Sequence, residues 1–124
     1  MKDEDLKTRT RNFALRIIRL YTQLPNKTEA QVIGKQILRS GTSVGAHYRE
    51  SCRAKSDADF ISKLEGGLQE LEETQYWLEL LTEAEIIPQE RLTLLQTEAE
   101  ELIAIFVTMV KKVKARQNPK KGTE

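Results

Sequence analysis

Apolar residues recur every three or four positions through the last third of the chain, and no other sequence feature constrains the fold as strongly. Such a spacing puts these side chains on one side of an α-helix, because the helix repeats every 3.6 residues. It predicts a helix over residues 88–117, with Pro88 near the first turn. The predicted stripe comprises Leu92, Leu95, Ala99, Leu102, Phe106, Met109 and Val113.

The same spacing in three earlier segments predicts helices over residues 3–24, 28–53 and 57–85. Pro25 disfavours helix at the residue before it. Thr28 and Gln31 have the spacing of a capping box, and Ser56 or Asp57 is suited to cap the third helix. In chain order the stripes comprise Leu6, Phe13, Ile17, Leu20 and Leu24; Ile33, Ile37, Val44 and Tyr48; and Ile61, Leu64, Leu68, Leu71, Gln75 and Leu78.

These segments define the fold class. Runs of alternating apolar and polar residues are absent from the sequence, so no strand is expected. A chain of 124 residues is long enough for one core and too short for two domains. Helices with short connections pack as antiparallel neighbours. The sequence therefore predicts an all-α, up-and-down antiparallel four-helix bundle over residues 1–117, followed by a flexible tail over 118–124.

The middle of the second predicted helix, residues 40–46, is rich in small residues and contains Gly41 and Gly45. Two glycines cost a helix about 1 kcal/mol each relative to alanine. Small residues are suited to a place where another helix backbone approaches closely. A break or kink in the helix is the alternative interpretation of the same segment.

Residues 102–110 are apolar on almost every side of the last predicted helix. A surface helix needs a single apolar stripe to pack against its own core, so a second apolar face needs a second partner. We interpret this face as a subunit interface and expect a homo-oligomer. The interface candidates are Ile103, Ile105, Val107 and Val110.

The residues that catalytic and metal sites require are scarce. His47 and Cys52 are the only histidine and cysteine, and their spacing points them about 140° apart on a helix. One histidine cannot supply the two Glu-x-x-His motifs of a di-iron bundle. Glu70 and Glu73 are better explained as a solvated face or a salt bridge than as a catalytic pair. We therefore expect no enzyme activity, no metal and no cofactor.

Features of the N-terminus and of the cysteine content indicate the compartment. The first residues, MKDEDLKTR, are charged rather than apolar, and no apolar run approaches the ~20 residues needed to span a bilayer. A lone cysteine cannot form an internal disulfide. We expect a cytoplasmic protein that does not contact a membrane.

The net charge is only +1, yet the charges are segregated along the chain. Residues 1–55 have a balance of +7, residues 56–105 of −11 and residues 106–124 of +5. Solvated faces, attraction between subunits and a basic surface for nucleic acid are all compatible with this pattern. The candidate nucleic-acid-binding residues are one arc of the second helix and the last turns of the fourth: Lys35, Arg39, Arg49, Arg53, Lys111, Lys112, Lys114 and Arg116.

Three motifs connect the chain to a known family. The sequence has Arg39-Ser40-x-x-Ser43-Val44-Gly45-Ala46, then residues 53–56 (RAKS), then residues 76–78 (YWL). In this order they resemble the bacterial four helix bundle protein family, over nearly the whole chain. That family includes proteins encoded by intervening sequences in ribosomal RNA genes and is related to accessory variability-determinant proteins of retroelements. His47 departs from the asparagine expected at its position.

The resemblance implies a four-helix bundle assembled as a ring-like homopentamer. In the retroelement relatives, the ring binds a reverse transcriptase and nucleic acid through a basic surface. For the ribosomal RNA branch, which the near-neutral charge favours, the resemblance supplies no established activity that could be carried over to this chain. Two function classes therefore stay open: a module that binds RNA, DNA or a ribosomal component, and a structural scaffold or protein-partner module that binds no nucleic acid.

Overall fold

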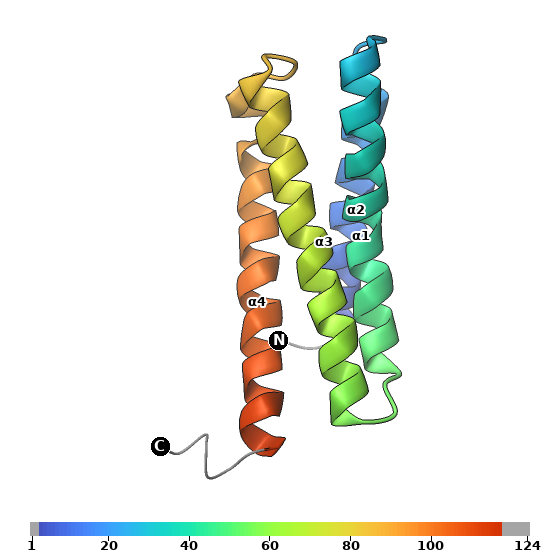
Figure 1. Cartoon of the computed structure of the whole chain (residues 1–124), viewed down its shortest axis with the longest axis vertical. Coiled ribbons are helices and arrows are strands. Elements are labelled where there is room, and N and C mark those ends of the chain that lie inside the picture. Colours follow the sequence, from blue (N-terminus) through green and yellow to red (C-terminus); the bar gives the residue numbers. More distant parts are fainter. Residues whose placement is uncertain (1–2, 118–124) are drawn as a thin grey trace.

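The computed structural model describes residues 3–117, and within them every regular element is helical (Figure 1). The elements are α1 (Asp3–Thr22), α2 (Thr28–Cys52), α3 (Asp57–Glu83), a short 3₁₀ helix η1 (Gln89–Arg91), and α4 (Thr93–Gln117). The all-α prediction is confirmed over this range. The expected flexible tail, 118–124, lies outside the described residues.

The four long helices run alternately up and down the bundle (Figure 1). Helix α2 packs against both α1 and α3, and α3 also packs against α4, whereas α1 and α4 touch over a small area. The α2–α3 joint and the C-terminal end of α4 lie at one end of the bundle, called the lower end here after its place in Figure 1. The α1–α2 and α3–α4 joints lie at the other, upper end.

The predicted apolar stripes form most of the core. Phe13, Ile17, Val44 and Tyr48 are fully buried, and Phe106 of α4 lies with its ring centroid 6.0 Å from that of Tyr48. On α3 the buried positions include Gly67 and Thr74, while the predicted members Leu68 and Gln75 are half-buried. Thr74 forms a hydrogen bond with Ser40 of α2 at 2.7 Å, so the buried surface of α3 extends beyond the predicted stripe toward α2.

Helix α2 is continuous through its small residues, so the kink interpretation is wrong and the close-packing interpretation is confirmed. A Cβ atom added at Gly41 would lie 2.6 Å from Cγ1 of Ile17 on α1. One added at Gly45 would lie 3.1 Å from Oγ1 of Thr10. Both glycines thus let the backbone of α2 approach α1.

Two predicted helix ends differ from the structure. The N-cap of α2 is Lys27, whose side chain makes no capping bond, so the predicted Thr28 capping box is wrong. The Gln31 side chain instead donates to the Pro25 carbonyl at 3.1 Å and accepts from the Tyr21 hydroxyl at 3.2 Å, which ties the helix to the preceding turn. Helix α1 ends two residues earlier than predicted, at Thr22, although Leu24 is still buried.

At the other two joints, the predicted cap of the third helix is confirmed and the predicted start of the last helix is wrong. Ser56 caps α3 as predicted, its hydroxyl accepting from the Asp59 backbone N–H at 3.1 Å. The helix expected from residue 88 is interrupted, because residues 89–91 form η1 before α4 begins. Glu85 adopts φ 60° in the joint before it, a left-handed conformation that ends the preceding helix.

The second apolar face of α4 is smaller than the sequence indicates. Val110 is buried in the core, so it cannot present a free face to a second subunit, and that part of the prediction is wrong. Ile103 and Ile105 are half-buried and pack against the same core, and Val107 is half-buried. The physical reason is that Val110 follows Leu102 and Phe106 at intervals of four residues, so it lies on the face of α4 that these two bury.

Candidate nucleic-acid interface

The candidate cations of α2 are spread along the whole helix. Lys35 lies near the upper end and Arg53 caps the lower end, about 27 Å apart at 1.5 Å per residue. Arg49 and Arg53 are exposed and make no ion pair with a described residue. The structure therefore does not present the four α2 cations as one compact site.

Arg39 is committed to contacts within the subunit. Its Nη1 donates to Glu70 at 3.2 Å and its Nη2 donates to Glu73, both on α3. The hydrogen bond from Arg39 holds the pKa of Glu73 below its usual value, and the same bond raises the pKa of Arg39. Glu70 and Glu73 therefore connect α3 to α2 by binding the same arginine, as the salt-bridge interpretation expects.

The cations of the last helix divide into two groups. Lys114 pairs with Glu65 at 3.3 Å and Arg116 with Asp57 at 2.9 Å, so both tie α4 to α3. Lys111 and Lys112 are exposed and pair with no described carboxylate. In the up-and-down topology their end of α4 lies at the same end as Arg53 (Figure 1).

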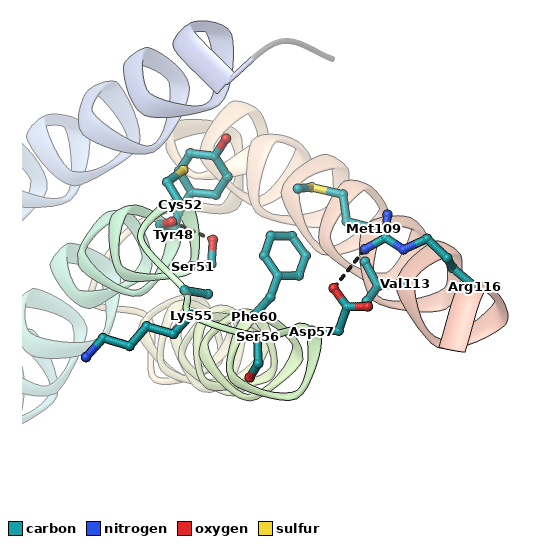
Figure 2. A pocket seen from close by; sticks show the side chains of 11 residues that line it. Tyr48, Ser51, Cys52, Lys55, Ser56, Asp57, Phe60, Met109, Val113 and Arg116 are labelled. Atoms are coloured by element: carbon teal, nitrogen blue, oxygen red, sulfur yellow. Dashed lines mark hydrogen bonds and ion pairs between the residues drawn. The ribbon is translucent and has the colours of Figure 1, made fainter. Parts of the chain in front are cut away.

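A hollow of about 520 Å³ lies at the lower end, and Lys55 and Arg116 are the cations that line it (Figure 2). The end of α2, the joint to α3, the first turn of α3 and the last turns of α4 form its walls. Phe60 points into it from α3 and faces Met109 of α4. The lining residues are Tyr48, Ser51, Cys52, Ala54, Lys55, Ser56, Asp57, Phe60, Met109, Val113 and Arg116.

The chemistry of this hollow is mixed. Phe60 and Met109 supply an apolar floor, while Arg116 stays on the rim through its bond to Asp57. The Ser51 hydroxyl donates to the Tyr48 carbonyl at 2.6 Å, so its hydrogen bond is made within α2. An aromatic side chain beside cations is the combination that single-stranded nucleic acid uses, with bases on the ring and phosphates on the cations.

Sequence reasoning missed Lys55 and Phe60. Lys55 falls in a joint rather than on the helical arc, and Phe60 lies outside the predicted stripe of α3. A usable signal existed, because in an up-and-down bundle the α2–α3 joint must lie beside the end of the fourth helix. That rule alone brings residues 53–60 to the same end as 109–116.

Other chemical groups do not gather into a site. Within residues 5–117, the His, Cys, Asp and Glu side chains form no cluster that could hold a metal ion. His47 Nδ1 lies 4.0 Å from a carboxylate oxygen of Glu50, and the ring lies against α3, since a Cβ at Gly66 would approach its Cε1 to 2.8 Å. No described helix has the length and apolar character needed to cross a membrane.

The fold defines this chain as a small helical-bundle protein. Clusters of charged side chains are the main chemical feature of the surface described above. The chain belongs to the 23S rRNA-intervening sequence protein family, whose model matches residues 2–108. It is similar to a solved protein of unknown function from the S23 ribosomal protein family of Bacteroides thetaiotaomicron. The two share 44% identity and superpose with a TM-score of 0.83, over 90% of this chain and 99% of that one. No curated protein matches the chain.

Proposed function

We propose that this protein is a non-enzymatic, oligomeric helical bundle that binds nucleic acid, alone or within a ribonucleoprotein, at its lower end. The observation that carries the proposal is that two helices and a joint place five unpaired cations at this end of the bundle, where one of them, Lys55, lines a hollow together with Phe60. We call this set the basic end; it comprises Arg49, Arg53, Lys55, Lys111 and Lys112.

Charge pairing separates the basic end from the other cations. Arg39, Lys114 and Arg116 already neutralise carboxylates of α3, so a phosphate would have to compete with a carboxylate for them. The basic end has no such competitor among the described residues. Its lysines and arginines remain available to phosphate, and arginine can donate two parallel hydrogen bonds to one phosphate group.

Assembly strengthens weak contacts. The family resemblance implies a homopentamer, and we propose that assembly here. A ring would repeat the basic end once in each subunit, and contacts that are weak singly would add through effective concentration. Sedimentation equilibrium at micromolar concentration tests the assembly, and a single species of 14.3 kDa would contradict it.

Binding should be independent of sequence and sensitive to salt. Phosphate contacts release condensed counterions, so the affinity should fall linearly on a logarithmic scale as salt rises. The test is a fluorescence-anisotropy titration of single-stranded and structured RNA at several salt concentrations. We expect Arg53→Gln/Lys112→Gln to weaken binding and to lower the salt slope by about one unit for each phosphate that the variant no longer binds.

The matched control is Lys27→Gln/Lys35→Gln, which removes the same charge at the upper end of α2. Both lysines are exposed and pair with no described residue. The proposal predicts near wild-type affinity for this control. Equal weakening in the two variants would mean that the affinity depends on net charge and not on the position of the cations. Absence of RNA binding at low salt would favour the alternative function, a structural scaffold or protein-partner module.

A further inference from the structure

A second cationic hollow lies at the upper end of the bundle, between α1 and the start of α4. Its volume is about 240 Å³, and Arg16, Arg19 and Arg91 line it together with Gln23. Its remaining walls are leucines, and no carboxylate is among its lining residues. We call this hollow the arginine groove; the leucines are Leu20, Leu92, Leu94 and Leu95.

The arginines of this groove lack acidic partners. Arg91 Nη2 donates to the neutral Gln23 Oε1 at 2.6 Å, and neither Arg16 nor Arg19 pairs with a described carboxylate. Elsewhere in the subunit, Arg9, Arg39 and Arg116 have acidic partners, whereas Arg11, Arg49 and Arg53 pair with no described carboxylate. The position of Arg19 in the last turn of α1 suits the helix dipole, but that accounts for only one of three cations.

An exposed apolar side chain accompanies the groove. Leu94, on its wall, is 76% exposed, whereas Leu15 and Ile18 are exposed on α1 outside the lining of the groove. The other large apolar side chains exposed among the described residues are Val32 and Tyr76, on α2 and α3. The groove thus has one strongly exposed apolar residue, Leu94, and α3 has one exposed aromatic residue, Tyr76.

The exposed face of α3 that carries Tyr76 is acidic. Glu72, Tyr76, Glu79 and Glu83 follow one another at intervals of three and four residues and so share one face of α3. None of these three carboxylates pairs with a described cation, and all four side chains are exposed. We call this the acidic face. Tyr76 lies against Trp77, with ring centroids 5.0 Å apart, which supports the tyrosine in its exposed position.

The arginine groove and the acidic face cannot meet within one subunit. Helix α1 packs against α2 and touches α4, and α3 packs against the same two helices, so α1 and α3 lie across the bundle from each other. Both surfaces lie in the upper half of the bundle, since α1 ends there and α3 runs up to the same end (Figure 1). The two surfaces have opposite charge, lie at the same height along the bundle axis and face different sides of the subunit.

We propose that the arginine groove binds the acidic face of α3 from a second copy of this chain. Two different patches then meet at each contact, which makes the interface heterologous, and repeated heterologous contacts close a ring when the rotation allows it. Because both patches lie at the same level, successive subunits need no shift along the bundle axis. This inference rests on the proposed oligomer and assigns its contacts; it does not depend on nucleic-acid binding.

A carboxylate-bearing helix matches the groove better than a lone anion does. The groove offers leucines as well as guanidinium groups, and the acidic face offers Tyr76 among its carboxylates. Aromatic and arginine side chains are enriched in the centres of protein interfaces. Charge complementarity between the two patches would also exclude contact between two copies of the same patch.

Charge reversal tests the pairing. Arg16→Glu/Arg19→Glu puts like charges across the contact, and so does Glu79→Arg/Glu83→Arg. We expect each double variant to raise the subunit concentration of half-dissociation by at least about tenfold, because like charges in contact oppose association strongly. The chain that carries all four changes has complementary patches again and should assemble as the wild type does. Sedimentation velocity measures the assembly, and circular dichroism checks that each variant folds.

The control Lys27→Glu/Lys35→Glu reverses the same number of charges outside both patches and should keep the wild-type assembly. Wild-type assembly in both double variants would overturn the inference, as would failure of the folded four-change chain to reassemble. Loss of stabilisation by inorganic phosphate in Arg16→Glu/Arg19→Glu without any change in assembly would also overturn it, in favour of an anion site. RNA affinity of Arg53→Gln/Lys112→Gln is measured separately, so the nucleic-acid proposal can fail while this one stands.

Discussion

Helix α1 has two neighbours in the bundle, and its two contacts are built differently. Against α2 it packs closely, because Gly41 and Gly45 leave room for Ile17 and Thr10. Against α4 it is joined by Arg9, which binds Glu98 and Glu101, and nearer the upper end the two helices leave the arginine groove open between them. The α1–α2 contact is therefore specified by the shapes of its side chains, and the α1–α4 contact by a salt bridge. A salt bridge can hold two helices together beside an open groove, whereas close packing leaves no such space.

The largest expected effect comes from the shape-specified contact. Gly45→Leu should destabilise the protein by about 1–3 kcal/mol, because the added side chain must displace Thr10 or separate α1 from α2. Chemical denaturation followed by circular dichroism measures the change. Ala46→Leu is the control, since Ala46 is exposed on the same turn and should tolerate leucine. Equal stability of Gly45→Leu and the wild type would contradict close packing.

A smaller effect is expected from the charge-specified contact. Hydrogen bonding to Glu98 raises the pKa of Arg9, and its Nε donates to Glu98 Oε2 at 3.0 Å. Arg9→Gln should cost about 1 kcal/mol, since Glu98 would remain partly buried without its partner. High salt should shrink that cost by screening. Arg11→Gln, at an exposed position of the same helix, should change the unfolding free energy by less than about 0.5 kcal/mol.

The smallest effect concerns the salt bridges of Arg39 between α2 and α3. Because Arg39 lowers the pKa of Glu73, the bond stabilises the folded state above the unfolded pKa and is lost as the pH falls through the lowered folded value. Glu73→Gln should therefore cost up to about 1 kcal/mol at pH 7 and progressively less below pH 4.5, the ordinary value for this carboxyl. A difference from the wild type that grows on acidification would have the wrong sign.

The sequence predicted the parts of this structure that depend on periodicity. The stripes of the first and last helices, the Ser56 cap and the close approach at Gly41 and Gly45 all follow from spacing and residue size. The same spacing applies to Val110, which follows Leu102 and Phe106 at intervals of four residues, so its assignment to a second face overlooked a signal in the sequence. The Thr28 cap failed since Gln31 bonds to the turn instead.

The candidate site was predictable only in part. Helical projection grouped Arg39 with Arg53, but projection ignores both the distance along the axis and the partner helix that Arg39 reaches. Long arginine side chains can cross to a neighbouring helix, and spacing alone does not say whether a carboxylate will meet them there. The joint residue Lys55 and the floor residue Phe60 required the topology as well as the pattern.

The two ends of the bundle also differ: we assign the unpaired cations of the lower end to nucleic acid and the arginine groove of the upper end to a second subunit. Hydrogen–deuterium exchange of the assembled wild type, with and without single-stranded RNA at low salt, tests this division most directly. RNA should slow exchange in residues 48–60 and 109–117 and leave residues 27–39 unchanged. Protection confined to residues 27–39, or none anywhere under conditions in which RNA is bound, would contradict the assignment of nucleic acid to the basic end.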